Sequence, residues 1–140
     1  MKIGVVCGSF DLIHQGHINL IKKASNQCDY LIVGVNSDKR IITAKKHNPI
    51  LSQDTRLEII KELKPVKEAF IIDDGLQLIE LLENKGVVIN EYYRGDDNKN
   101  SPEQIRENKI LRSKNIKPVY FKHTKGIHSS TIVDRIRNHS

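Results

Sequence analysis

The most informative stretch of this chain is Cys7-Gly8-Ser9-Phe10-Asp11-Leu12-Ile13-His14-Gln15-Gly16-His17. It follows an apolar, β-type run at residues 3–6 and leads into a helical pattern from residue 18. A strand, a glycine-bearing loop and a helix N-terminus in this order form a ready phosphate site. His14 and His17 stand where the helix begins, so two ring N–H donors can join the backbone amides facing an anion. The stretch therefore predicts a site for a nucleoside triphosphate.

The rest of the chain alternates short apolar runs, rich in β-branched residues, with helical patterns. The expected strands cover residues 3–6, 30–35, 69–72, 87–89 (continuing towards 93) and 118–121, and the expected helices cover residues 18–27, 53–63, 75–85, 102–115 and 129–138. Strands that are apolar on both faces indicate a parallel sheet covered on both sides. We therefore predict an α/β fold: a single Rossmann-like, doubly wound, five-stranded parallel sheet of order 3-2-1-4-5, with helices on both faces.

Several helix boundaries are legible in the sequence. Ser52, Asp74 and Ser101 precede helical patterns and are expected to cap them, with Pro102 at the first helical position and Gly86 ending the helix before it. The segment 36–48 is expected to be a long polar loop. In the predicted order, ligands bind at the switch between the first and fourth strands, beyond their carboxyl ends.

Length and composition bound the classes of protein. The 140 residues suit one domain, 1–140, and no run approaches the length of a membrane span. The N-terminus lacks the pattern of a signal peptide, so a cytoplasmic location is expected. Cys7 and Cys28 are too few for a disulfide framework or a zinc site and are expected to be reduced thiols.

The net charge of +6 is unevenly placed. Residues 1–100 hold 14 Lys and Arg against 14 Asp and Glu, whereas residues 101–140 hold 9 against 3. A nucleic-acid surface would need clustered basic residues with exposed aromatics, and the chain has no Trp. Solvated helix faces account for most of these charges, and a triphosphate or a phosphorylated substrate could use the remainder.

The opening motif resembles the signature of the HxGH nucleotidyltransferases. Gly8-Ser9-Phe10-Asp11 followed by His14-x-Gly16-His17 is most similar to the cytidylyltransferase branch, typified by the glycerol-3-phosphate cytidylyltransferases. Adenylyltransferases of the coenzyme A pathway usually have Thr where His14 stands. The purely structural alternative is a strand–helix turn whose histidine caps the helix and binds no ligand. For Asp11 the alternatives are an Asx turn and an acceptor that orients the loop or lies near a metal ion.

A second motif resembles the cytidylyltransferase stretch Arg-Thr-x-Gly-Ile-Ser-Thr-Thr/Ser. It runs from His123 to Thr131, and its matching residues are Thr124, Gly126, Ile127, Ser129 and Ser130. His123 replaces the family arginine and His128 replaces the first serine, and Lys125 could compensate for the lost fork. The serines could also simply cap the last helix. The resemblance implies that these residues, His123 and His128 included, hold the β- and γ-phosphates.

The resemblance also assigns roles between the two motifs. It implies that Arg56 contacts the phosphates or the acceptor, that Lys45 and Lys46 approach them from a loop, and that Asp38 lies near the acceptor. A solvated helix arginine and an ordinary mobile lysine loop are the alternatives. Arg94-Gly95-Asp96 resembles a Gly-Asp-Asp stretch that lies against the nucleotide, and here the alternative is a capping carboxylate at a strand end. We thus expect His14, His17, Lys46 and Arg56 to be catalytic, Lys45 and Asp38 to bind substrate, and the remaining residues to bind the nucleotide: Gly8, Ser9, Phe10, Asp11, Gly16, Arg94, Gly95, Asp96, His123, Thr124, Gly126, Ile127, His128, Ser129 and Ser130.

The predicted reaction is transfer of CMP from CTP to a small phosphorylated alcohol, with release of pyrophosphate and with Mg²⁺ accompanying the triphosphate. Such transfer needs orientation and charge stabilisation more than a base, because a phosphate oxygen is already a nucleophile. Adenylyl transfer to a phosphorylated sugar or cofactor precursor is the alternative, and a non-catalytic module that binds a nucleotide or a nucleic acid is another. Zinc binding by His14 and His17 would need a third ligand, which is not evident. The family also implies a homodimer.

Overall fold

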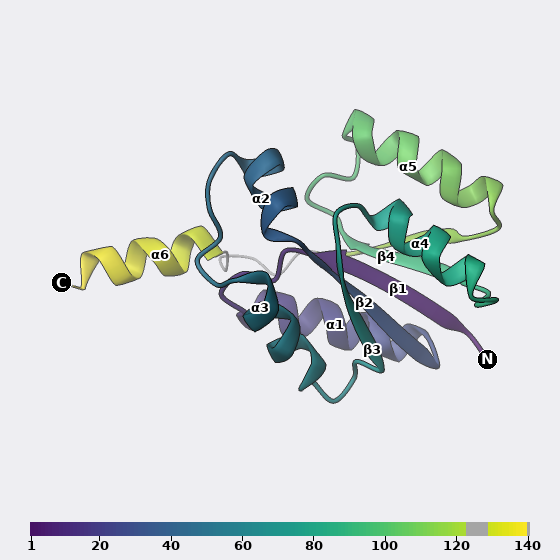
Figure 1. The fold of residues 1–140 in the computed structure, drawn as a ribbon, viewed down its shortest axis with the longest axis horizontal. Helices are drawn as coiled ribbons and strands as arrows, with labels where there is room; N and C mark the ends of the chain where they lie inside the picture. Colours follow the sequence, from purple (N-terminus) through teal and green to yellow (C-terminus); the bar gives the residue numbers. More distant parts are fainter. Residues whose placement is uncertain (123–128, 140) are drawn as a thin grey trace.

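The computed structural model describes residues 1–122 and 129–139, and these form one parallel sheet flanked by helices (Figure 1). The strands are β1 (Ile3–Gly8), β2 (Tyr30–Asn36), β3 (Glu68–Ile72), β4 (Glu91–Gly95) and β5 (Lys117–Phe121). The helices of the described residues are α1 (Gln15–Gln27), α2 (Asp38–Lys45), α3 (Gln53–Lys61), α4 (Gly75–Asn84), α5 (Pro102–Ser113) and α6 (Ser129–Asn138). All pairings are parallel and the order is β3-β2-β1-β4-β5, so the predicted fold class is confirmed.

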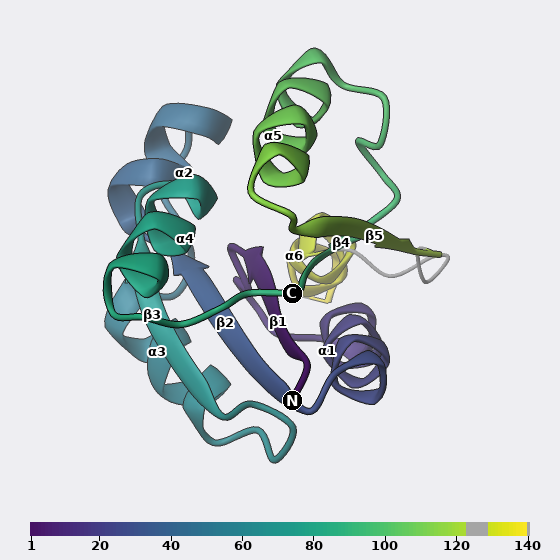
Figure 2. The ribbon, with the colours of Figure 1, turned by 90° about the vertical axis from the view of Figure 1, so that its right-hand side faces the viewer.

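Two hydrophobic clusters lie on the two faces of the sheet. On one face, Val6 and Tyr93 pack with residues of α1 and α3, including Ile21 and Ile60. On the other, Val5, Ile32 and Tyr92 belong to a cluster with residues of α4 and α5: Leu78, Ile79, Leu82 and Leu111. Successive strand side chains point to opposite faces, so the neighbours Tyr92 and Tyr93 serve different clusters. Figure 2 shows the sheet between the two helix layers.

The centre of the sheet places the ends of β1 and β4 side by side. Val6 lies opposite Tyr93 in the β1–β4 register, and Gly8 lies opposite Val35 in the β1–β2 register. The chain leaves β1 towards α1 on one face and leaves β4 towards α5 on the other. The predicted switch point therefore lies at the carboxyl ends of β1 and β4.

Two local predictions are wrong. The segment 36–48 contains the helix α2, whose N-cap Ser37 accepts a hydrogen bond from the Arg40 amide, and whose Ile41 is buried. The fourth strand does not cover residues 87–89 but begins at Glu91, and Val88 is 73% exposed. Apolar residues alone marked the wrong segment, because the true strand begins with a charged residue.

The predicted helix ends agree with the structure. Ser52, Asp74 and Ser101 are N-caps whose side chains accept hydrogen bonds from backbone amides of the first turn. Pro102 opens α5, and Gly86 follows α4 with a φ of 82°. The left-handed conformation favours glycine and ends that helix.

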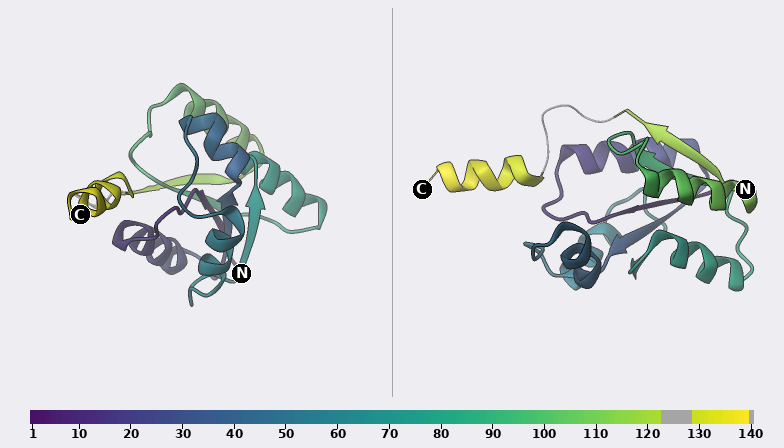
Figure 3. Two further views of the ribbon diagram at one scale, coloured as in Figure 1. Left: turned by 60° about the vertical axis from the view of Figure 1, so that its left-hand side comes forward. Right: turned by 90° about the horizontal axis from the view of Figure 1, so that it is seen from above.

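The helix α6 extends away from the sheet and its flanking layers (Figure 3). Three of its residues, Thr131, Ile132 and Val133, are half-buried, whereas Ile136 is 63% exposed. None of the helices in the described part of the chain combines the length and apolar character needed to cross a membrane.

Candidate active site

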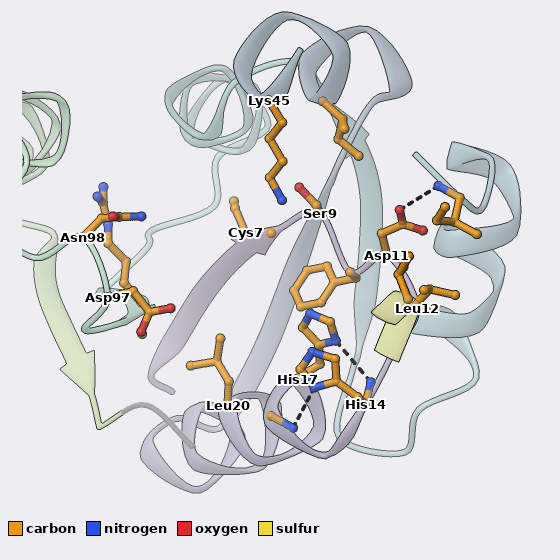
Figure 4. A pocket seen from close by; sticks show the side chains of 18 of the residues that line it. Cys7, Ser9, Asp11, Leu12, His14, His17, Leu20, Lys45, Asp97 and Asn98 are labelled. Atoms are coloured by element: carbon orange, nitrogen blue, oxygen red, sulfur yellow. Dashed lines mark hydrogen bonds between the residues drawn. The ribbon is translucent and has the colours of Figure 1, made fainter. Parts of the chain in front are cut away.

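A cavity of about 940 Å³ opens beyond the carboxyl ends of β1 and β4, at the switch point of the sheet (Figure 4). Five parts of the chain line it: the β1–α1 segment, α2 with the loop after it, the segment from β4 to α5, the end of β5, and α6. Its lining residues include Cys7, Gly8, Ser9, Phe10, Asp11, His14, Gly16, His17, Lys45, Arg94, Gly95, Asp97, Asn98, Gln104, Val133, Asp134 and Arg137. Polar and cationic groups thus converge on one concave site, as in ligand-binding pockets generally.

His14 and His17 hold each other at the start of α1. The His14 Nδ1 accepts a hydrogen bond from the Gly16 amide at 3.0 Å, and the His17 Nδ1 accepts one from the His14 amide at 3.2 Å. The pair forms a capping box in which imidazoles do the work usually done by hydroxyl and carboxylate side chains. Because Nδ1 accepts in both neutral rings, the proton of each lies on Nε2.

The two rings lie against one another inside the cavity. Their centroids are 3.9 Å apart with an interplanar angle of 27°, and the Phe10 ring meets His17 edge-on at 5.5 Å. Burial lowers the pKa of His17 to about 4; the neighbouring His14 and Lys45 also lower it, and Asp11 opposes them. His17 is therefore a neutral N–H donor at neutral pH.

The loop between β1 and α1 is strained and clamped. Phe10 and Leu12 both have a φ of 51°, which is uncommon for residues with side chains. The Asp11 carboxylate accepts hydrogen bonds from the amides of Ile50 and Leu51, at 2.7 and 2.9 Å. Asp11 thereby ties this loop to the segment before α3 while it also lines the cavity.

Arg56, for which a catalytic role was expected, is not among the residues that line the cavity. The side chain is fully buried, with Nε donating to the Leu51 carbonyl at 2.9 Å and Nη1 donating to the carbonyls of Ser9 and Asn36 at 2.7 and 2.6 Å. Its Nη2 pairs with Asp38 at 2.7 Å. Asp38 also lies outside the cavity lining, so this pair joins the ends of β1 and β2 to α2 and α3 from behind the site.

The two lysines at the end of α2 differ in position. Lys45 belongs to the cavity lining, and Figure 4 shows its amine extending towards Ser9. Lys46 is the left-handed C-cap of α2, with a φ of 58°, and is not a lining residue. The structure thus brings the expected substrate lysine to the histidines, but not the expected catalytic one.

The end of β4 supplies the opposite wall of the cavity. Arg94 and Gly95 line it, whereas Asp97 rather than the expected Asp96 reaches the lining. The Arg94 guanidinium lies 4.9 Å from the Tyr92 ring, and its Nη1 is 3.6 Å from the Glu107 carboxylate. Burial raises the pKa of Glu107, and the charge of Arg94 opposes that rise.

The second motif falls largely outside the described residues. His123, Thr124, Gly126, Ile127 and His128 belong to the segment 123–128, and the side chains of Ser129 and Ser130 are not described either. The helix that follows reaches the site, since Val133, Asp134 and Arg137 line the cavity.

Sequence reasoning missed several lining residues. Asn98, Gln104 and Arg137 belong to no motif, and only the position of Asn98 after a strand and of Gln104 near the start of the next helix could have marked two of them. Within the described residues, no group of three or more His, Cys, Asp or Glu side chains could hold a metal ion.

Comparison with known proteins agrees with this geometry. The family model described as cytidylyltransferase-like matches residues 5–135. The bifunctional protein HldE of Bradyrhizobium sp. (strain ORS 278) is 28% identical over 141 residues, which cover 99% of this chain and 27% of that protein. The FAD synthase of Ferroglobus placidus is 38% identical over 74 residues, covering 53% of this chain and 47% of that enzyme. The chain thus spans about a quarter to a half of the length of these relatives.

Solved structures share the fold at low sequence identity. The lipopolysaccharide core biosynthesis protein from Thermoplasma volcanium GSS1 superposes with a TM-score of 0.69 at 24% identity, over 91% of this chain and 99% of that one. The pantoate-beta-alanine ligase from Francisella tularensis gives 0.60 at 18% identity, over 97% of this chain and 69% of that one. Because the family model covers almost the whole chain, including both histidines of its opening motif, the chain belongs to the cytidylyltransferase-like family of nucleotidyltransferases.

Proposed function

We propose that this chain transfers an adenylyl group from ATP to a small phosphorylated acceptor and releases pyrophosphate. The observation that carries the proposal is the pair of stacked imidazoles at the N-terminus of α1, both with Nδ1 bound to a backbone amide and both in the cavity lining. Two Nε2–H donors, held by their own helix, suit a triphosphate and the charge that develops on it.

The reaction follows from ordinary phosphoryl chemistry. An oxygen of the acceptor phosphate attacks the α-phosphorus of the nucleotide, a new P–O bond forms, and the bond to the bridging oxygen breaks so that pyrophosphate leaves. His14 and His17 would orient the triphosphate and donate hydrogen bonds to it, and Lys45 would bring positive charge. No side chain is needed to remove a proton, because the attacking phosphate oxygen is already ionised. Mg²⁺ would be held by the phosphates themselves.

ATP is the proposed donor because of the relatives. FAD synthase forms, by its name, a product that contains an adenylyl group, and its matched segment is 38% identical to this chain. CTP, the donor expected from the sequence, is the second candidate. It is supported by the description of the family and by His14, which stands where the resemblance places threonine in coenzyme A pathway enzymes.

The test is a pyrophosphate-release assay with each of the four nucleoside triphosphates against a panel of phosphorylated alcohols, sugars and cofactor precursors. Release with ATP and one class of acceptor is the expected result, and release with CTP alone would favour the second candidate. Binding of ATP or CTP by calorimetry, without release for any acceptor, would contradict catalysis and indicate a nucleotide-binding module. His17→Ala provides the matched negative control in each assay.

A further inference from the structure

Arg94 belongs to the wall of the cavity opposite the histidines. It precedes the last residue of β4 and points to the same sheet face as Tyr92, whose ring lies 4.9 Å from its guanidinium carbon. His17 instead contacts Phe10, which belongs to the cluster on the other face. Figure 4 shows Asp97 and Asn98, which follow β4, across the cavity from His14 and His17. The cavity therefore has one wall with the two histidines and an opposite wall with Arg94.

One edge of the Arg94 guanidinium faces a carboxylate, and the other edge has no hydrogen-bond partner among the described residues. Nη1 faces Glu107 at 3.6 Å, while Nε and Nη2 are buried and meet no hydrogen-bond acceptor among the residues that the structure describes. These two nitrogens share one edge of the planar group, which is the fork that binds a carboxylate or phosphate with two parallel hydrogen bonds. The side chain is only 10% exposed, so water does not freely solvate that edge.

Gln104 of α5 adds a polar group to the same wall. Its Oε1 accepts a hydrogen bond from the Tyr120 hydroxyl at 3.0 Å, and that hydroxyl in turn accepts one from the Asn108 amide at 2.8 Å. With its oxygen held in this way, Gln104 presents its amide N–H groups as donors in the cavity lining. The wall thus combines a positive fork with a neutral donor.

We propose that the Nε–Nη2 edge of Arg94 is the anchor for an anionic group of the acceptor, a phosphoryl or carboxylate group bound in bidentate fashion. The inference rests on the proposed function in taking the acceptor to be the second ligand of the cavity. Buried donors need partners, and among the described residues the buried side-chain donors without one are the two nitrogens of this edge. The triphosphate is assigned to the histidine wall, so the two anionic ligands meet from opposite sides.

The experiment is a titration with inorganic phosphate and glycerol 3-phosphate as probes, in the presence of a saturating, non-hydrolysable ATP analogue. In the wild-type protein, the ¹⁵N–¹H resonance of the Arg94 Nε–H should shift on addition of either probe. Calorimetry should show at least a tenfold loss of probe affinity in Arg94→Met, an intermediate loss in Arg94→Lys, and no change in Arg106→Met, which removes an exposed arginine of α5. Affinity for the ATP analogue should stay within twofold in all variants.

The possible outcomes are separable. Unchanged probe affinity in Arg94→Met, or a wild-type Nε–H signal that ignores both probes, would overturn the proposal. A fall in analogue affinity would overturn it too, because the fork would then belong to the triphosphate. Nothing here requires turnover, so a failure of the pyrophosphate-release assay does not mimic any of these results. The wild-type resonance keeps the test valid even if a variant fails to fold.

Discussion

Arg56, which is fully buried, and Arg94, whose side chain is 10% exposed, both lie near the ends of central strands, yet their surroundings differ completely. Arg56 donates to three backbone carbonyls and one carboxylate, and its side chain is 0% exposed. Arg94 has one carboxylate at 3.6 Å, an aromatic ring beneath it and an edge that meets no acceptor in the described part of the chain. A buried arginine whose donors all have partners within the chain stabilises the fold. One whose donors lack partners within the chain is a candidate for binding a ligand.

The histidines lie between these two cases. Each has one nitrogen hydrogen-bonded to the backbone and both line the cavity, so the same rings build the helix start and face the cavity. Capping and binding, which the sequence presents as alternatives, are therefore compatible.

The largest effect expected from this comparison is on Arg56→Met. The substitution leaves the carbonyls of Leu51, Ser9 and Asn36 and the Asp38 carboxylate without their donor, so the free energy of unfolding should fall by about 3–5 kcal/mol. Urea denaturation measures it, with the exposed-residue variant Arg106→Met as control. A loss below about 1 kcal/mol would show that the network is not structural.

Next in size is the loss of a ring donor at the histidine wall. His17→Ala should lower turnover by about a hundredfold or more, since one preorganised donor is typically worth about 3–4 kcal/mol of barrier. His14→Asn sharpens the test, because asparagine caps a helix well but lacks the ring Nε2–H. Its stability should stay within about 1 kcal/mol of wild type while turnover falls. Steady-state kinetics with near wild-type rates for either variant would remove the assigned role.

A smaller effect concerns pH. The pKa of His17 is lowered to about 4 in the folded protein, below its ordinary value of 6.5, so the unfolded chain takes up this proton first as pH falls. Its contribution to stability is therefore complete above pH 6.5 and declines between there and pH 4. Denaturation of wild type and His17→Gln over this range should show a decline that is steeper in wild type. Parallel curves, or a His17 NMR titration near 6.5, would refute the neutral ring.

The smallest expected change is in the stability of Arg94→Met. Replacing a poorly paired buried charge by an apolar side chain of similar length is often neutral or stabilising, so the free energy of unfolding should stay within about 1 kcal/mol of wild type or rise. The same denaturation experiment as for Arg56→Met measures it. A loss comparable with that of Arg56→Met would erase the distinction between the two arginines.

Much of the fold was readable because local signals and the sheet agree. Ser52, Asp74 and Ser101 cap helices through their own first-turn amides, which sequence spacing can reveal. The helix α2 was missed although Ser37 and Asp38 provide a cap and a first-turn carboxylate, because the flanking lysines favoured a loop. The start of β4 was beyond reach. Glu91 is buried there because its carboxylate pairs with Lys2, which is distant in sequence, and accepts a hydrogen bond from the Tyr93 hydroxyl.

For the candidate site too, some features were predicted from the sequence and others were not. The glycine loop and the paired histidines were found from spacing, since a strand, a turn and a helix start are contiguous in the chain. The roles of the arginines were not, because Arg56 and Arg94 are identical side chains whose partners come from other elements. Only the folded structure shows that Arg56 is surrounded by carbonyls of three segments. It also shows that Arg94 lines the cavity with two nitrogens that have no acceptor among the described residues.

By itself, the sequence determined the α/β order, the paired histidines at the start of α1 and the family. Those features depend on residues that are neighbours along the chain. Tertiary structure alone decided which cations build the scaffold and which face a ligand, because hydrogen-bond satisfaction in a buried site is a property of the assembled surroundings and not of the residue.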